Sequence, residues 1–244
     1  MNGNNHLEVI ELIKIMNTGM TEPILCKCND GNLYVVKSTA SVSRKELIHE
    51  LVAAKLAKSI GLPIPDFAIA YVSKDIIDFL PPNFKGKISN GYAFASFYIE
   101  ETSPIKFNEA HSVIDRQKQK YIYFFDRIIN NSDRCLSLLG GNVNIIYNHQ
   151  KQSYYIIDHN LAFDPSCDAN AFSEHVFSPK NRDWVYDMFD ELTNTQLADT
   201  LNNQCATAIA ELPEDWINDQ AHVIENIIAL LCRGSEKYFR REIL

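Results

Sequence analysis

The stretch that most constrains the fold is residues 142–158, which read as a β-hairpin ending in a carboxylate. Residues 143–147 and 154–158 are mostly apolar or aromatic, and the polar segment 148–153 joins them as a turn. Asp158 ends the second run, and a carboxylate among apolar residues is costly unless a cation meets it. We therefore expect a metal ion at this strand end.

Two asparagines are candidate partners for this carboxylate. Antiparallel pairing brings the start of the first strand beside the end of the second, so Asn142 and Asn144 are expected within a few Å of Asp158. An amide oxygen and a carboxylate, close after a loop that contains Asp133, make a site for a hard cation. A register slip of one residue would change which asparagine shares a face with Asp158, so both are candidate ligands.

The N-terminal half supplies a lysine on an inward-facing strand position. Residues 22–37 read as two short strands joined by Asn-Asp-Gly-Asn, which is typical of a hairpin turn. Leu33, Val35 and Lys37 share one face of the second strand. Lys37 therefore points in the direction of the apolar residues.

A helix carrying a glutamate follows. Ser43 and Glu46 form a capping box, and Gly61 with Pro63 ends the helix. Glu50 lies at the edge of its apolar face. A strand lysine and a helix glutamate are the two residues that position nucleotide phosphates in protein-kinase-type phosphoryl transfer.

The remainder of the chain changes from strands to helices. Further strands are expected in "DFAIAYVS" and "YAFASFYIEE", and one helix is expected over residues 109–130. From Asp183 to the end the sequence reads as helices broken at Pro213. The chain is predicted to be an α+β protein with a β-rich first part and a mostly helical second part, without internal repeats.

Composition limits the partners and the compartment. The net charge of −8 and the lack of a Lys/Arg-rich patch argue against direct binding to nucleic acid or to an anionic membrane. We expect no signal peptide and no membrane span, and hence a cytoplasmic protein. The six cysteines show no zinc-site spacing. Cys26 and Cys28 are predicted to be buried free thiols, with metal binding as the alternative.

The order of the polar residues points to phosphoryl transfer. Asp133 follows a predicted helix, and an Asn-bearing strand and the metal-facing Asp158 come after it. In kinases an Asp in the first of these places accepts the proton of the substrate hydroxyl, and the later Asn and Asp hold Mg²⁺. The neighbouring Arg134 either contacts a phosphate or braces the loop, and His159 is expected to orient a neighbour by hydrogen bonding.

With these residues in view, the sequence resembles the HipA-like kinase family, and in particular its compact kinase domains. The resemblance covers nearly the whole chain. It is carried by "YVVK" at 34–37, "HELVAAKLAKSIGLPIPD" at 49–66, "FDRIINNSDR" at 125–134, "NVNIIY" at 142–147, "YIIDHNLAF" at 155–163 and "LPEDW" at 212–216.

The resemblance implies a two-lobed, protein-kinase-like fold that binds ATP and Mg²⁺. It implies that Lys37 holds phosphates and pairs with Glu50, that Asp133 is the catalytic base, and that Asp158 and Asn142 or Asn144 are metal ligands. The N-lobe would span residues 1–100 and the C-lobe residues 101–244. The expected nucleotide contacts are Gly19 and Met20 in the phosphate-covering loop, and Tyr98, Ile99 and Glu100 in the interlobe segment.

The sequence departs from the family pattern at one place. In the family an Asn usually follows the catalytic Asp by five residues, but position 138 is Leu here. The segment "CLSLLGG" delays the first Asn to position 142. This insertion either leaves Asn142 in place beside a bulged loop or weakens metal binding.

We therefore expect an ATP- and Mg²⁺-dependent kinase that phosphorylates a Ser or Thr hydroxyl, most simply on a protein. The alternatives are a kinase of the same fold for small molecules and a pseudokinase that binds nucleotide without turnover. Full-length HipA proteins are toxin kinases of toxin–antitoxin systems, often repressed by a DNA-binding partner. By analogy, a regulatory protein partner is expected for this chain.

Overall fold

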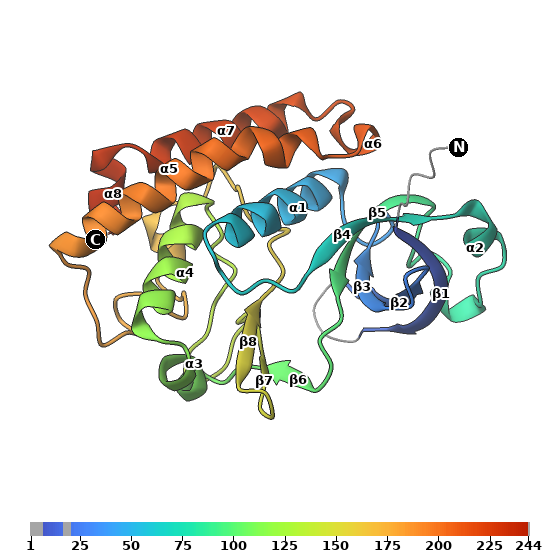
Figure 1. Ribbon diagram of the computed structural model, residues 1–244, viewed down its shortest axis with the longest axis horizontal. Helices are drawn as coiled ribbons and strands as arrows, with labels where there is room; N and C mark the ends of the chain where they lie inside the picture. Colours follow the sequence, from blue (N-terminus) through green and yellow to red (C-terminus); the bar gives the residue numbers. More distant parts are fainter. Residues whose placement is uncertain (1–6, 17–20, 244) are drawn as a thin grey trace. The chain divides into compact units, whose positions relative to one another are not determined.

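The computed structural model describes residues 7–16 and 21–243, and it divides into two compact units, which are described separately (Figure 1). Unit 1 contains the described residues within Met1–Ile48, together with Pro65–Ile99 and Pro213–Asn218. Unit 2 contains His49–Ile64, Glu100–Leu212 and the described residues of Asp219–Leu244.

Unit 1 is built around a closed β-barrel with the strand order β1-β2-β3-β5-β4. All neighbouring strands are antiparallel except β1 and β4, whose parallel pairing closes the barrel. The strands are β1 (Leu7–Ile15), β2 (Ile24–Cys28), β3 (Leu33–Lys37), β4 (Phe67–Val72) and β5 (Gly91–Phe97).

The predicted hairpin of β2 and β3 is confirmed. Its turn is fixed by Asp30, whose Oδ1 accepts a hydrogen bond from the Asn32 backbone N–H at 3.0 Å. Gly31 has φ +84°, a left-handed conformation that a residue with a Cβ adopts at a cost. Tyr34 donates its hydroxyl to Asp30 Oδ2 at 2.8 Å, so the turn is tied to the following strand.

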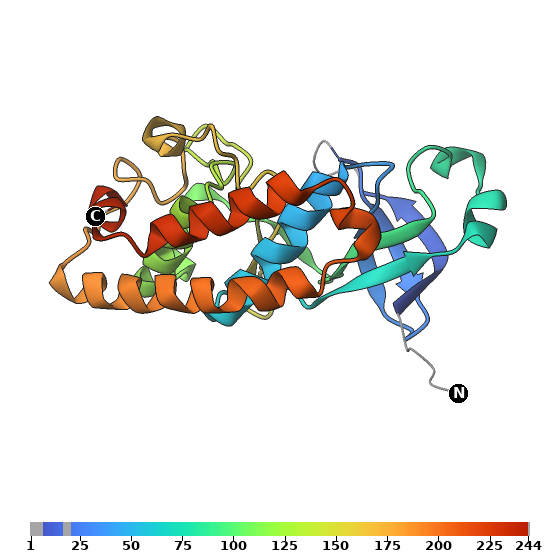
Figure 2. The same ribbon diagram turned by 90° about the horizontal axis from the view of Figure 1, so that it is seen from above.

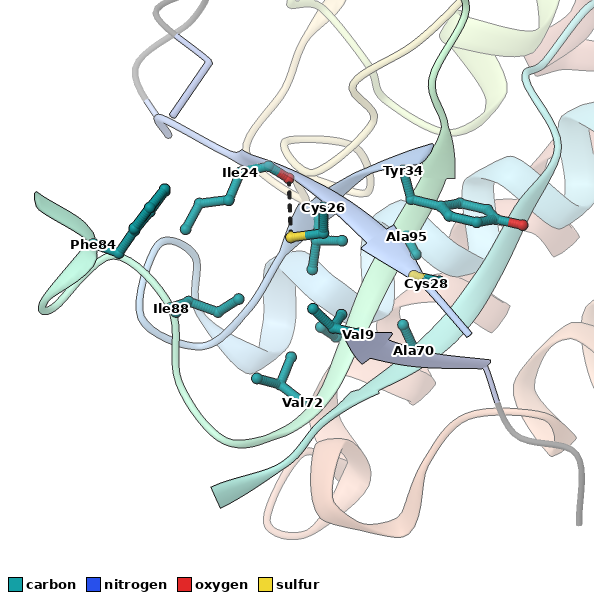
Figure 3. Close-up of a cluster of buried hydrophobic side chains, with 12 residues drawn as sticks. Val9, Ile24, Cys26, Cys28, Tyr34, Ala70, Val72, Phe84, Ile88 and Ala95 are labelled. Atoms are coloured by element: carbon teal, nitrogen blue, oxygen red, sulfur yellow. Dashed lines mark hydrogen bonds between the residues drawn. The ribbon is translucent and has the colours of Figure 1, made fainter. Parts of the chain in front are cut away.

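The barrel core contains two cysteines as ordinary apolar side chains (Figure 3). Cys26 and Cys28 are both fully buried and both free thiols, as predicted. Burial raises the pKa of Cys28 to about 12, and burial also raises the pKa of Cys26 far above its ordinary value. Both thiols are therefore protonated and packed with neighbours such as Val9 and Ala95.

Three short helices complete unit 1. α2 (Lys74–Asp78) and the 3-10 helix η1 (Pro82–Phe84) lie along the chain between β4 and β5. α6 (Glu214–Ile217) comes from the far end of the sequence, and its Trp216 donates Nε1–H to the Tyr92 carbonyl oxygen on β5 at 3.2 Å. This tryptophan is almost fully buried, so α6 is packed into the unit.

The predicted capping box begins α1 (Arg44–Ser59). The Ser43 backbone N–H donates to Glu46 Oε2 at 2.7 Å, and the Glu46 N–H donates to Ser43 Oγ at 3.2 Å. The helix ends before Gly61, whose φ is +70°. Residues 49–59 of α1 belong to unit 2.

The region expected to be helical over residues 109–130 is helical, but it contains two helices rather than one. The structure has α3 (Phe107–Val113) and α4 (Arg116–Ile128), separated at Asp115. Asp115 is extended and accepts the Lys118 N–H at 3.0 Å, so it caps a new helix instead of continuing the old one. The aromatic and apolar side chains of α4 are buried in unit 2.

The C-terminal helices are α5 (Met188–Ala210), α7 (Ala221–Gly234) and α8 (Lys237–Ile243), and the predicted break at Pro213 separates α5 from α6 and α7. α5 and α7 run side by side in unit 2 (Figure 2). A short 3-10 helix, η2 (Ala169–Phe172), precedes them along the chain. Among the described residues, no helix combines the length and the apolar character that crossing a membrane requires.

A second sheet in unit 2 has the strand order β6-β7-β8. It consists of β6 (Thr102–Pro104), β7 (Ile145–Asn148) and β8 (Ser153–Ile156). β7 and β8 pair antiparallel, with Ile145 opposite Ile156, which confirms the hairpin predicted from the sequence.

Candidate active site

The hairpin ends where the sequence predicted polar residues to meet. The Ile157 N–H donates to the Asn144 carbonyl oxygen at 2.9 Å, which extends the pairing beyond β8 up to Asp158. Asp158 has φ +59° and Asn144 has φ +45°, and both are left-handed conformations that cost of order 1–3 kcal/mol for a residue with a Cβ. The backbone is therefore bent at both strand ends, which is a common feature of functional sites.

Both candidate asparagines bind Asp133. Asn142 Nδ2 donates to Asp133 Oδ2 at 2.8 Å, and Asn144 Nδ2 donates to the same oxygen at 2.9 Å. The sequence left open which asparagine belongs to the site, and the structure brings both to one carboxylate. Asn144 is buried and Asn142 is exposed, so Asn144 is the more firmly held of the two.

Asp133 and Asp158 are close enough for their charges to interact. Burial raises the pKa of Asp133, and the charge of Asp158 raises it further. The amide hydrogen bonds from Asn144 and Asn142 lower it, but the pKa stays above the ordinary value of an aspartate. A carboxylate with a raised pKa accepts a proton more readily, which is the property a general base requires.

The insertion after Asp133 leaves the loop as a small hairpin. The Cys135 N–H donates to the Asn142 carbonyl oxygen at 2.8 Å and closes it. At its tip, the Ser137 N–H donates to the Gly140 oxygen at 3.1 Å. The leucines between them, at 138 and 139, are exposed. Asn142 lies beside Asp133 in spite of the insertion, and the effect of the insertion on metal binding stays a prediction.

A buried ion pair holds this loop in place. Arg134 and Asp126 are both fully buried, and Arg134 Nε donates to Asp126 Oδ2 at 2.7 Å. Asp126 also accepts from Asn131 Nδ2 at 2.8 Å and from His175 Nε2 at 2.9 Å. Burial disfavours the ionised carboxylate, but the Arg134 charge and the His175 hydrogen bond outweigh it and hold the pKa of Asp126 well below its usual range.

Arg134 also reaches the two strand ends. Its Nη1 donates to the Asn144 carbonyl oxygen at 2.6 Å, and its Nη2 lies 3.0 Å from His159 Nε2. Because a guanidinium only donates, His159 accepts at Nε2. Arg134 therefore braces the loop, and the alternative of a phosphate contact is wrong because every side of its guanidinium is buried against protein.

His175 is neutral in this network. It accepts the Phe177 N–H at Nδ1, at 3.0 Å, so its proton is on Nε2 and is donated to Asp126. Burial lowers the pKa of His175, in agreement with an uncharged ring. Asp126 and His175 were not among the residues predicted for the site. The signal available was an aspartate among the apolar residues of α4, where a charge needs a partner.

Glu50 belongs to the same unit as these residues. Its Oε1 accepts the His159 backbone N–H at 3.0 Å, so α1 is bound to the residue that follows Asp158. Lys37 is a buried residue of β3 in unit 1, where it is paired with Phe94. The ion pair of Lys37 with Glu50 stays a prediction.

The expected nucleotide contacts are only in part described. Gly19 and Met20 lie outside the described residues. The Tyr98 N–H donates to the Leu33 oxygen at 2.9 Å, and Glu100 accepts at its carbonyl oxygen from Asn148 Nδ2 at 3.0 Å. Ile99, which lies between these two residues in the sequence, is half-buried and is the last residue of its segment of unit 1.

The donor set at Asp133 fits a hard divalent cation. It consists of the carboxylates of Asp133 and Asp158 and the side-chain oxygens of Asn142 and Asn144, which are the ligands that Mg²⁺ prefers. Nowhere in the described part of the chain, this site included, is there a group of three His, Cys, Asp or Glu side chains that could hold a metal ion. The side chains gathered here carry oxygen atoms, the type of ligand that hard divalent cations take, and no cysteine or histidine side chain of a zinc site is among them.

Comparison with protein families matches residues 9–243 to a family described as HipA-like kinase. A comparison with curated protein sequences finds no significant relative.

Among solved structures, the proinflammatory kinase CtkA of Helicobacter pylori is similar in fold. It has 13% sequence identity and a TM-score of 0.57, and the match covers 94% of this chain and 93% of that one. The kinase-like fold predicted from the sequence is thereby confirmed.

Two weaker similarities have TM-scores below the level at which a fold argument holds. A Golgi casein kinase has 12% identity and a TM-score of 0.45, over 96% of this chain and 74% of that one. HipA of Shewanella oneidensis MR-1, solved with HipB and operator DNA, has 11% identity and a TM-score of 0.39, over 83% and 58%.

Proposed function

This chain belongs to the HipA-like kinase family, and we propose that it transfers the γ-phosphate of ATP, with Mg²⁺, to a Ser or Thr hydroxyl of a protein. The observation that carries the proposal is the convergence of Asn142 and Asn144 on the carboxylate of Asp133, beside the charge of Asp158. Family membership supports a kinase, and the residues at this carboxylate support the particular chemistry.

In the proposed reaction Asp133 orients the acceptor hydroxyl and takes its proton. The raised pKa of Asp133 favours this step, because the carboxylate gains a proton more readily than an exposed aspartate does. The two amides fix which oxygen of Asp133 is engaged and leave Oδ1 for the hydroxyl. Positioning of this kind supplies much of the rate in phosphoryl transfer.

Asp158, with Asn142 or Asn144, would hold Mg²⁺. When bound, Mg²⁺ neutralises the negative charge of the phosphates. Lys37 would bind the phosphates and Glu50 would pair with Lys37, as the family resemblance implies. Glu50 also fixes the backbone at His159, so its side chain would keep the residue next to Asp158 in place. Gly19, Met20, Tyr98, Ile99 and Glu100 are proposed as nucleotide contacts.

We further propose that residues 1–100 act as the N-lobe and residues 101–244 as the C-lobe of one kinase domain, and that the protein works in the cytoplasm under a regulatory protein partner. The looped-out insertion favours an active kinase over the pseudokinase alternative, because Asn142 keeps its bond to Asp133.

The test is transfer of label from γ-labelled ATP with Mg²⁺. Casein-type protein, sugars, inositides and aminoglycosides are offered separately, with Asp133→Asn as the inactive control. Labelled protein with wild type, and none with Asp133→Asn, is the expected result. If only a small molecule is labelled, the acceptor is a small molecule and not a protein. Absence of transfer at high enzyme concentration would contradict the proposal.

A further inference from the structure

Unit 2 contains a pocket whose lining includes none of the residues proposed for the transfer reaction. It has a volume of about 310 Å³ and is lined by the end of α4, the region of η2, and residues of α7 and α8. None of Asp133, Asn142, Asn144 and Asp158 lines it. Two of the lining residues are arginines, at positions 127 and 233.

Arg127 is a buried cation held by aromatic rings. Only 6% of the residue is exposed, and its guanidinium lies 4.9 Å from the centre of the Phe172 ring. Its one side-chain hydrogen bond within the described part of the protein is from Nη1 to the Tyr123 hydroxyl, at 3.3 Å. No carboxylate of the described residues forms an ion pair with it.

Arg233 also lines the pocket and lies against an aromatic ring. Its guanidinium lies 4.0 Å from the centre of the Phe239 ring, and its Nη2 donates to Asn130 Oδ1 at 2.7 Å. Its Nε–H is buried and has no acceptor among the residues that the structure describes. Burial lowers the pKa of Arg233, and the charge of Arg127 lowers it further, so the two guanidiniums repel each other across the pocket.

The acidic residues that line the pocket, within the described part of the chain, form no ion pair with either arginine, although the charges of Glu236 and Glu242 act on Arg233. The Asp168 carboxylate is occupied as the N-cap of η2, where it accepts from the Asn170 and Ala171 N–H groups at 2.9 and 3.1 Å. Glu236 and Glu242 are exposed, where water screens their charges. The deep part of the pocket is therefore positive and its rim is acidic.

We propose that this pocket binds the phosphate group of a phosphate monoester, with Arg127 and Arg233 as its ligands. Two guanidiniums match the two charges of such a group, and their flat N–H edges match its oxygens in pairs. A buried Nε–H without an acceptor gains the bond it lacks when an oxyanion enters. The aromatic rings of Phe172 and Phe239 orient the guanidiniums without consuming their N–H groups.

The acidic rim selects against more highly charged ligands. Glu236 and Glu242 repel a polyphosphate tail that extends out of the pocket, whereas a single phosphate is enclosed between the arginines. The ligand is therefore a monophosphate, either a free small molecule or a phosphorylated side chain. This site is independent of the proposed transfer centre, because it shares no residue with it.

Isothermal titration calorimetry with the full chain tests the proposal. O-phospho-L-serine, inorganic phosphate and acetate are titrated in EDTA, so that metal-dependent binding elsewhere is suppressed. Arg233→Gln is expected to weaken phosphoserine binding about tenfold or more, because a charge-assisted hydrogen bond is lost. Arg241→Gln is the matched control, since Arg241 is an exposed residue of α8 outside the pocket. Equal affinity for acetate, or no effect of Arg233→Gln, would overturn the proposal.

A second measurement on the wild type locates the ligand even if a variant fails to fold. Phenylglyoxal modifies accessible arginines, and peptide mass spectrometry reports each position. Phosphoserine should protect Arg233, which is partly exposed, and leave the exposed Arg241 unprotected. Protection of none of the pocket arginines would refute the assignment. A phosphoserine peptide that binds more tightly than the amino acid identifies a protein side chain as the source, and the reverse order identifies a small molecule.

Discussion

Replacing Asp126 by Asn should destabilise unit 2 strongly. The substitution keeps the shape of the side chain but removes the charge that faces Arg134 at 2.7 Å. Both residues are 0% exposed, so Arg134 would be left as a buried cation facing a neutral amide, with the Asn144 carbonyl oxygen and His159 as its other acceptors. Removal of one partner of a buried pair costs about 3–5 kcal/mol.

Urea denaturation followed by tryptophan fluorescence measures this change, since Trp184 is buried in the same unit. With a denaturant slope of about 2 kcal/mol per M, the midpoint should fall by about 1.5–2.5 M. Asp183→Asn is the matched control: Asp183 pairs with Arg116 at 2.7 Å, but both side chains are mostly exposed. That pair is worth about 1 kcal/mol or less. If the two variants lose equal stability, the account of Asp126 as the brace is wrong.

Two further changes test the geometry around Asp133. Asp133→Asn should lower turnover by about 10²–10⁴-fold, because the general base is lost. The variant should also have a higher thermal midpoint at neutral pH. The pKa of Asp133 is higher in the folded chain than in the unfolded chain, so ionisation of Asp133 favours unfolding. The stability gained by the variant should vanish below about pH 3.9, where the carboxyl group of the wild type is protonated as well. A variant less stable than wild type at neutral pH would contradict the raised pKa. Gly141→Ala should lower turnover about 10²-fold, since the new Cβ would lie 2.5 Å from the Cys135 carbonyl oxygen and displace the loop that carries Asn142. Gly140→Ala is the control, because Gly140 also has a positive φ but no atom within 4 Å of the added Cβ; equal activity of the two variants would exclude the steric explanation.

Local patterns were enough to predict much of the fold. The turn at Asp30 and Gly31, the capping box of α1 and the β7–β8 hairpin are each determined by residues close in sequence, and the structure contains all three. β1 was not predicted, because most of its side chains are exposed and its apolar residues do not alternate regularly. Its place depends on pairing with β2 and β4, which sequence periodicity does not reveal.

At the site, order along the chain identified Asp133, Asn142, Asn144 and Asp158 as a group. It did not indicate that both asparagines would bind Asp133, since that depends on how the insertion closes at Cys135. The brace was missed for a related reason. A buried aspartate in a helix is stabilised by partners 8 and 49 residues away, and only the tertiary structure brings those partners together.

The most direct test of the central claim is calorimetric titration of ATP, with and without Mg²⁺, into wild type, Asp158→Asn and Asp133→Asn. The account predicts that Mg²⁺ increases the ATP affinity of wild type and of Asp133→Asn, and that this increase is lost in Asp158→Asn, whose metal-binding carboxylate is gone. If Mg²⁺ increases the ATP affinity of Asp158→Asn as much as that of wild type, Asp158 holds no metal and the proposed centre is wrong.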